Sequence, residues 1–447
     1  MERRISFKNL YLIGVISLGL IGLGVGSTFA MFTASAEISD PISLTSGLNY
    51  QDDIVDLVDM TISSNKVETA TLNIKNNTDK TLNYTSWYKT NNNNLQIGTV
   101  VSNDYSVTGT IEPNQSAQII VSIRNRGTGV AKVTVGISAS ESDIVVSNGI
   151  TTLPTNPLPP YLNDYITNLY TSNKDNGTVT NNSIEYKYAS SVNLMNDRLG
   201  DLSTDIDKGN IRYYGSDPSN YIDIEDRDSN DNAILYRIIG IFDNKVKVVR
   251  NDSIGNYAYD VSDSTINDGK GINEWSGADL MKVLNPGYST SSAYWNNGIS
   301  GNAKKLIQSS TWNLGGLSSS AVYANDLYTS ERGTTVITSP SDNVVRTTAW
   351  TGKVGLVYLS DIAYASNLNS CSGTFDSYSS DSNCSSYLLS GNYWTISPTT
   401  TDVSKVYTNT SSLDGSSEIA VRPTFYLIEN TALESGTGTD TDPYVVD

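Results

Sequence analysis

The segment Leu153–Pro160 has four prolines in eight residues, and it divides the chain into two parts with different sequence patterns. Proline has no backbone N–H and a fixed φ, so this density of proline suits neither a helix nor a paired strand. It favours an extended, polyproline-like backbone. We therefore expect a linker over 153–160 with folded domains on both sides, in keeping with the two or three domains that 447 residues usually form.

The part before the linker consists of short runs in which apolar and polar residues alternate, separated by turn signals. The clearest runs are Ala70–Ile74, Leu82–Tyr88, Ile119–Ile123 and Val133–Ile137. A period of two residues places one face of each run in a core, which predicts β-strands. About seven such strands in ~110 residues are typical of an immunoglobulin-like β-sandwich, which we expect over 37–152.

The part after the linker, residues 161–447, mixes helical and strand periods and predicts an α+β domain. Two apolar runs flank Asp243 and Asn244 and predict a β-hairpin with a two-residue turn. Helical patterns occur in three segments: Tyr161–Tyr170, Trp275–Leu284 and Asn302–Ser309. Further strands are predicted at Val354–Leu359, Tyr393–Ile396 and Ala420–Ile428, of which the last two are expected to close the domain as a pair.

The first 36 residues have the three parts of a secretory signal peptide. Arg3, Arg4 and Lys8 precede an uncharged apolar stretch, Leu10–Gly26, and an Ala-Ser-Ala cleavage site follows at 34–36. An uncleaved anchor is the alternative, because the apolar stretch reaches the lower edge of the ~17–25 residues that span a bilayer. We predict an exported protein, either secreted or at the cell surface, that contacts a membrane only if this signal is not cleaved.

Histidine is absent, and the formal net charge is −18 at pH 7. Without histidine there is no Ser-His-Asp or Cys-His-Asn constellation and no H-E-x-x-H zinc helix. A surface this acidic repels nucleic acid and anionic lipid, so we expect neither as a partner. Carboxylate chemistry remains, but no spacing singles out a pair from Glu274, Asp279 and Glu331. We therefore predict that the protein is not an enzyme.

The two cysteines, Cys371 and Cys384, are thirteen residues apart in a stretch rich in Ser, Asn, Asp and Gly. An extracellular location lets such a pair form a disulfide, which we expect here. The spacing is not C-x-x-C and no basic residue flanks either thiol, so a redox pair is the lesser alternative.

Tryptophan and tyrosine are the candidate binding residues of the second part. Tyrosine occurs 28 times, and both side chains have large apolar faces with a polar end, which suits glycan or protein surfaces. The alternative is that these residues serve strand surfaces and the core. The candidate binding residues are Trp275, Trp295, Trp312 and Trp350.

Asp226, Asp228 and Asn230 alternate as at the start of a calcium-binding loop. The match fails at the twelfth position, where Arg237 replaces Glu, and no glycine stands at the sixth. We therefore expect an exposed polar loop, with a weak Ca²⁺ site as the alternative and no other cofactor.

Several segments resemble a family of exported proteins of Gram-positive, often gut-dwelling bacteria, and this resemblance implies location and fold but no activity. The segments are Tyr236–Gly255, Asn273–Ser276, Leu284–Tyr288, Gly391–Trp394, Val421–Pro423, Ser435–Thr439 and Asp442–Tyr444. The end of the chain is also similar to C-type-lectin-like domains of the kind shared with sulfatase-modifying factors. This similarity implies a C-type-lectin-like fold in which Trp394 and Arg422 lie side by side as structural residues. Cys371 and Cys384 do not match the closely spaced catalytic pair of those factors.

The segment Gly24–Ala36 resembles the signals of biofilm-fibre and camelysin-type proteins. The mature domains of those proteins are β-sandwiches that can pair edge to edge, so the resemblance implies a capacity for self-assembly. The leading hypothesis is non-catalytic recognition or adhesion through a glycan or a surface protein. The alternative is a structural subunit of an extracellular fibre or biofilm matrix, and a carboxylate-based hydrolase ranks third.

Overall fold

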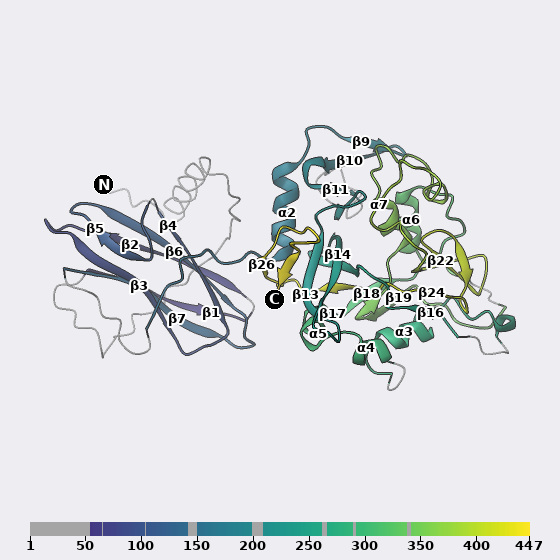
Figure 1. Cartoon of the computed structure of the whole chain (residues 1–447), viewed down its shortest axis with the longest axis horizontal. Helices are drawn as coiled ribbons and strands as arrows, with labels where there is room; N and C mark the ends of the chain where they lie inside the picture. The colour runs from purple at the N-terminus through teal and green to yellow at the C-terminus, as the bar shows by residue number, and fades with distance from the viewer. Residues whose placement is uncertain are drawn as a thin grey trace, which may run out of the picture. The chain divides into compact units, whose positions relative to one another are not determined.

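The chain consists of two compact units, Met1–Pro159 and Pro160–Asp447, each with its own hydrophobic core (Figure 1). Strands make up 39% of the structure and helices 14%, so the protein is mainly β, as predicted. No helix in the described part is long and apolar enough to cross a membrane. The signal segment 1–36 lies outside the described residues. The computed structural model describes residues 54–64, 66–102, 104–141, 150–198, 209–261, 266–288, 292–337 and 341–447.

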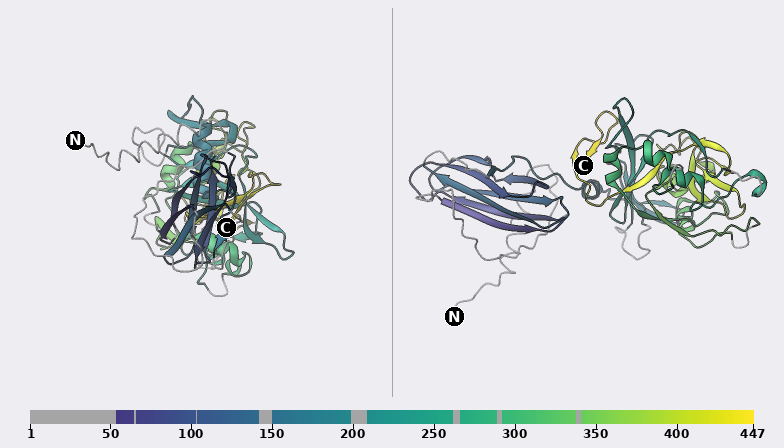
Figure 2. Two further views of the ribbon diagram at one scale, coloured as in Figure 1. Left: turned by 90° about the vertical axis from the view of Figure 1, so that its left-hand side faces the viewer. Right: turned by 90° about the horizontal axis from the view of Figure 1, so that it is seen from below.

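The first unit is a β-sandwich of two antiparallel sheets, whose strands run side by side in Figure 2. One sheet has the order β1-β7-β3-β5 with β8 beside β3, and the other has the order β2-β6-β4. The described strands are β1 (Ile54–Ile62), β2 (Val67–Lys75), β3 (Leu82–Thr90), β4 (Leu95–Val101), β5 (Thr108–Ile111), β6 (Ser116–Asn125), β7 (Ala131–Ser140) and β8 (Thr151–Thr152).

The strand order corrects the predicted immunoglobulin-like topology. Among the described strands, β1 pairs with β7, β2 with β6 and β3 with β5, so the pairs are nested around β4. An immunoglobulin order would place the first and second strands side by side. The nested order is that of a jelly roll, in which the chain behaves as one long rolled-up hairpin. Alternation predicts which side chains of a strand are buried, but it does not specify the neighbouring strand.

The predicted linker 153–160 is hydrogen-bonded to the first unit along much of its length. Leu153 is buried in the core of the sandwich. The backbone N–H of Thr99, in the edge strand β4, donates to the carbonyl of Asn156 at 2.7 Å. The guanidinium of Arg124 donates to the carbonyl of Pro159 at 2.7 Å. Prolines lack a donor but keep a free carbonyl, so the segment can cover a sheet edge by accepting hydrogen bonds.

The second unit combines helices with several sheets, as predicted. Its helices are α2 (Leu162–Asn173), α3 (Asp279–Leu284), α4 (Ala293–Asn297), α5 (Gly301–Leu306), α6 (Ala324–Glu331) and α7 (Leu359–Tyr364). The strands of its first half are β9 (Val179–Asn181), β10 (Ile184–Ala189), β11 (Leu194–Asn196), β12 (Ile211–Tyr213), β13 (Tyr221–Arg227), β14 (Ala233–Phe242), β15 (Lys245–Arg250) and β16 (Asn256–Ala258). The remaining strands are β17 (Ile307–Gln308), β18 (Ser310–Asn313), β19 (Ala349–Gly352), β20 (Val354–Gly355), β21 (Trp394–Pro398), β22 (Lys405–Thr408), β23 (Ser412–Asp414), β24 (Glu418–Ala420), β25 (Thr424–Leu427), β26 (Leu433–Ser435) and β27 (Tyr444–Val446).

The largest sheet has the order β17-β25-β15-β14-β12-β11-β10-β9. Off this path, β13 pairs with β14, β27 with β13, β26 with β27, and β20 with β25. The predicted hairpin is confirmed: β14 and β15 are antiparallel, and both turn residues, Asp243 and Asn244, have positive φ values of 47° and 63°. Such values belong to the type I′ turn that suits twisted hairpins. The predicted first helix is also confirmed as α2, which packs on β10, β14 and β15.

Three other predicted elements differ from the structure. The helix predicted over Trp275–Leu284 begins only at Asp279. The helix predicted over Asn302–Ser309 ends at Leu306, because Ile307 and Gln308 pair with β25 as a strand. The predicted closing strands meet only in one isolated bridge, between Tyr393 and Ala420. Otherwise β21 pairs with β22, whereas β25 pairs with β15, β17 and β20. Short apolar runs fit several partners equally well, so the choice rests on tertiary contacts.

Candidate functional site

A recess of the described residues lies in the second unit, beside β21. The centre of a water-sized sphere can occupy only about 10 Å³ of it, which is room for about one water molecule. The recess is therefore a shallow notch, far smaller than the ~300–1,000 Å³ of small-molecule sites. It is lined by Asn273, Glu274, Trp275, Leu314, Gly316, Val336, Ile337, Arg346, Thr347, Ile396, Pro398, Thr399 and Thr400.

Glu274 provides the carboxylate of this recess, and its oxygens are already occupied. The hydroxyl of Ser276 donates to it at 2.9 Å and the backbone N–H of Gly277 at 2.7 Å. The hydroxyl of Thr347, on the other side, donates at 2.9 Å. A carboxylate that accepts three hydrogen bonds from its own chain is held as a rigid acceptor and is poorly placed to move protons.

Arg346 provides the positive charge of the recess and is equally well satisfied. Its guanidinium donates to Asn273 at 2.6 Å, to both oxygens of Asp342 at 2.9 and 2.7 Å, and to the carbonyl of Val403 at 2.7 Å. Burial opposes the charge of Asp342, but the hydrogen bonds from Arg346 and Asn267 prevail and hold the pKa of Asp342 at about 2. The recess is therefore polar and pre-organised, with its charges paired internally.

An aromatic cluster backs the recess. Trp275 is 1% exposed, and its ring lies 6.0 Å from that of Trp350 and 5.4 Å from that of Tyr259. Tyr259 in turn lies 5.7 Å from Trp394. These rings meet edge to face or at a tilt, the arrangement that aromatic quadrupoles favour. The cluster fixes the backbone of Asn273–Trp275 at the wall of the recess.

The four tryptophans predicted to bind do not line one surface. Trp275 lines the recess but is 1% exposed, and the half-buried Trp350 packs against it without lining the recess. Trp312 is fully buried, and its ring lies 5.3 Å from Tyr426, so it offers no face to a ligand. Trp295 is half-buried in α4, away from the recess lining. The spacing of the four tryptophans in the sequence does not predict which of them are buried, because they lie on separate elements that only the tertiary structure brings together.

Trp394 and Arg422 are both buried, and the segments that carry them are neighbours. Tyr393 and Ala420 form an isolated parallel bridge, and the guanidinium of Arg422 lies 5.1 Å from the centre of the Tyr393 ring. Trp394 is the first residue of β21, and its indole N–H donates to the carbonyl of Tyr257 at 2.9 Å. Arg422 lies between β24 and β25, where its Nε donates to the carbonyl of Arg250 at 3.0 Å. The lectin-like role of the two residues stays a prediction.

The calcium candidates point in different directions. Asp226 is fully buried, and its carboxylate accepts hydrogen bonds from the hydroxyl of Tyr236 at 2.7 Å and the backbone N–H of Ser300 at 2.8 Å. Asp228 is exposed and accepts from the backbone N–H of Asn230 at 2.8 Å, which closes a turn. Among the described residues, no group of three or more Asp, Glu or Cys side chains is placed to hold a metal ion.

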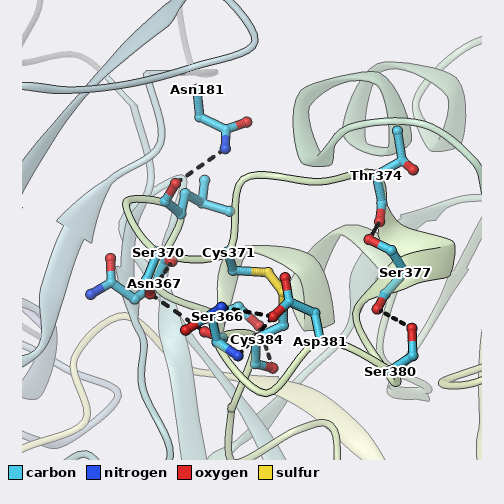
Figure 3. Close-up of a disulfide and its surroundings, with 12 residues drawn as sticks. Asn181, Ser366, Asn367, Ser370, Cys371, Thr374, Ser377, Ser380, Asp381 and Cys384 are labelled. Carbon is cyan, nitrogen blue, oxygen red and sulfur yellow. Dashed lines mark hydrogen bonds between the residues drawn. A yellow bond between two sulfur atoms is a disulfide. The ribbon is translucent and has the colours of Figure 1, made fainter.

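The predicted disulfide between Cys371 and Cys384 is confirmed (Figure 3). Both cysteines are buried. The loop is fastened at its start, because the side chain of Asn181 donates to the carbonyl of Leu368 at 3.1 Å. Asp381 caps the last turn before Cys384 by accepting from the backbone N–H of Asn383 at 2.9 Å. The pair therefore closes a structured loop on the core.

The other carboxylates considered for hydrolysis are also engaged. Glu331 is fully buried and accepts hydrogen bonds from the hydroxyls of Ser360 and Ser397. Burial raises its pKa, against the opposing effect of Arg332. Asp279 forms an exposed ion pair with Lys282 at 2.9 Å.

Sequence reasoning missed Asn273, Thr347 and Arg346, because the recess joins segments that are far apart in the sequence. It also missed a buried charge in β15, although a lysine within the apolar run Lys245–Arg250 is a signal of an inward-facing charge. Comparison of the chain with models of known protein families, with curated proteins and with solved structures finds no match.

Proposed function

We propose that this is an exported, non-catalytic recognition protein whose second unit binds a carbohydrate-like group over the recess beside β21. The observation that carries the proposal is the make-up of the mouth of the recess. The hydroxyls of Thr347 and Thr400 lie there beside an amide and a carboxylate that are held in place, and fixed polar groups of this kind recognise the hydroxyls of sugars. Trp275 is buried and forms the back wall of the recess. The signal-like segment 1–36 supports an extracellular location.

Recognition is favoured over hydrolysis because of the carboxylates. Glycoside hydrolysis needs two carboxyl groups about 5–9.5 Å apart on either side of the scissile bond. Among the described lining residues only Glu274 carries a carboxylate, and its oxygens accept hydrogen bonds from Ser276, Gly277 and Thr347. The recess thus offers contacts for binding but no acid and base pair.

A structural role in a fibre is the second candidate, and the edges of the sandwich favour it. β1 is nine residues long and, among the described strands, pairs only with β7. No described strand pairs with its other edge, and an unpaired strand edge is the usual template for pairing with another chain. A rise in mass with concentration in light scattering supports this candidate, and a constant monomer mass opposes it.

Binding is tested with the purified chain from Glu37 to Asp447 on a glycan array. Thr400 is half-buried at the recess, so Thr400→Trp fills the mouth without removing a side-chain hydrogen bond that holds the wall. Thr180→Trp, on the exposed edge strand β9, is the matched control. We expect binding by the wild type and the control, and at least a tenfold loss in Thr400→Trp with an unchanged melting temperature. Wild-type protein that binds no glycan, or Thr400→Trp that binds as well as the control, refutes the proposal.

A further inference from the structure

The core of the second unit contains a cluster of four charged side chains that contact one another and are almost completely out of solvent. Lys247, Asp361 and Asp197 have side-chain exposures of 0%, and Arg212 of 1%. Taking charges out of water costs several kcal/mol per ion, and only close pairing compensates for this. The recess and the proposed recognition function do not use this cluster.

The four groups meet through three ion pairs. The Nζ of Lys247, in the middle of β15, lies 2.5 Å from Oδ2 of Asp361, at the start of α7. Arg212, in β12, donates from one Nη to Oδ1 of Asp361 at 2.9 Å and from Nε to Asp197 at 2.5 Å. The backbone N–H of Tyr358 also donates to Oδ2 of Asp361, at 3.0 Å. The amine and the carboxyl group of the first pair are thus held in direct contact, 114 residues apart in the sequence.

The surroundings of Lys247 are aromatic. The rings of Phe242, Trp312, Tyr358 and Tyr426 have their centres 4.3 to 5.6 Å from Nζ. Burial lowers the pKa of Lys247 to about 8, against the opposing effect of Asp361. Burial acts in the other direction on Asp361, but Lys247 and Arg212 hold its pKa at about 2. The reactant is therefore an ion pair whose amine becomes neutral more easily than an exposed lysine does.

We propose that Lys247 and Asp361 condense to an intramolecular amide that cross-links β15 to α7. One ammonium proton passes to Oδ2, and the neutral amine attacks Cγ. The Cγ–Oδ2 bond then breaks as a second Nζ proton joins that oxygen, which leaves as water. One C–N bond forms, one C–O bond breaks, and no oxidant or co-reactant is needed.

Two features of the cluster favour this reaction. The contact between the groups makes the reaction intramolecular, and well-oriented groups reach effective concentrations of ~10⁵–10⁸ M. The guanidinium of Arg212 donates to Oδ1 of Asp361, where negative charge develops during the attack on Cγ, and it stabilises that charge in a fully buried site. Arg212 acts here as a positioning residue.

Charge balance points the same way. Before condensation the cluster has two positive and two negative groups. Condensation removes one of each and leaves Arg212 paired with Asp197 at 2.5 Å. The product therefore exchanges a buried ion pair for a neutral amide and leaves no unpaired charge among the four.

The test is peptide mapping of the wild-type chain after reduction, denaturation and complete trypsin digestion. An amide at Lys247 blocks cleavage there and joins Val246–Arg250 to the peptide Val354–Lys405. We expect a branched peptide that is lighter than the sum of its two parts by one water. A digest in which Lys247 is cleaved normally, and both peptides have the masses given by their sequences, overturns the proposal.

Lys247→Arg keeps the positive charge but lacks the nucleophilic amine. We expect no branched peptide in it and a melting temperature lower by about 10 °C, because a link across more than a hundred residues restricts the unfolded chain. Lys245→Arg, two residues earlier on the same strand, is the control and retains the branched peptide. A control that loses the branched peptide contradicts the assignment to Lys247. The wild-type digest decides the question even if Lys247→Arg fails to fold.

Discussion

Asp226 and Ser300 are 74 residues apart in the sequence, yet the backbone N–H of Ser300 donates a 2.8 Å hydrogen bond to the buried carboxylate of Asp226. Ser300 is the N-cap of α5, where its hydroxyl accepts from the backbone N–H of Ala303 at 3.1 Å. The second oxygen of Asp226 accepts from the hydroxyl of Tyr236 at 2.7 Å. This one carboxylate thus joins the end of β13, the middle of β14 and the start of α5.

Replacing Asp226 by Asn tests this structural role. Asn has one acceptor oxygen and an NH₂ group in place of the second, so only one of the two donors, the Ser300 N–H and the Tyr236 hydroxyl, can keep its present acceptor. We expect the free energy of unfolding to fall by about 1–3 kcal/mol in chemical denaturation. Asp228→Asn, in the exposed turn nearby, is the matched control and should change it by less than about 0.5 kcal/mol. A larger loss in the control than in Asp226→Asn contradicts this role.

The disulfide should stabilise the second unit. Cys371 and Cys384 close a loop with a sequence separation of 13. The chain-entropy model predicts a loss of about 3 kcal/mol when a loop of this size is opened. We expect the double variant Cys371→Ser/Cys384→Ser to unfold at lower denaturant concentration than the wild type, and reductant to lower the stability of the wild type alone. A double variant that still responds to reductant would show that the effect comes from elsewhere.

Stability should depend on pH through Asp260. Burial and the neighbouring carboxylate of Asp279 raise the pKa of Asp260 from 3.8 to about 6. A raised pKa means that the folded state favours the protonated form of Asp260. The contribution of the protonated carboxyl group to the free energy of unfolding is therefore complete below about pH 4, and it is lost as the pH rises through about 6.

The variant Asp260→Asn stays neutral and should remove this loss. We subtract the free energy of unfolding of the wild type from that of Asp260→Asn at each pH. This difference should be larger at about pH 8 than at about pH 4 by roughly 1 kcal/mol, a figure that allows for solvent screening of a partly exposed group. Thermal or chemical unfolding of both proteins at the two pH values measures the difference. An equal difference at both values would remove Asp260 as the cause. Asp252→Asn serves as the control, because Asp252 is exposed.

The close approach of Trp87 to Gly136 should make the first unit sensitive to a single methyl group. The two residues are opposite each other on β3 and β7. A Cβ on Gly136 would come within 2.5 Å of the Trp87 indole, which is buried. We expect Gly136→Ala to lower the stability of the first unit by about 1–3 kcal/mol through overpacking. Gly129→Ala, where a Cβ meets nothing within 4 Å, is the control and should be close to neutral. Intrinsic tryptophan fluorescence during unfolding reports on Trp87.

Local sequence patterns predicted those elements whose geometry depends on neighbours in the chain. The alternation in Ala70–Ile74 and Ile119–Ile123 identified strands β2 and β6, because a period of two buries one face wherever the strand lies. Asp243 and Asn244 predicted the hairpin turn, since these residues tolerate positive φ. The two cysteines and the mainly β character were likewise predictable from the sequence.

The tertiary structure decided which segments meet. Nothing local distinguishes a strand that pairs with its neighbour from one that pairs with the last strand, so the jelly-roll order of β1 and β7 was not predictable. For the same reason Trp312 is fully buried while Trp350, opposite it on the neighbouring strand, is only half-buried. The pairing of Lys247 with Asp361 depends on the tertiary structure, which brings the start of α7 to β15. A charged side chain is stable in the interior only when an opposite charge lies beside it.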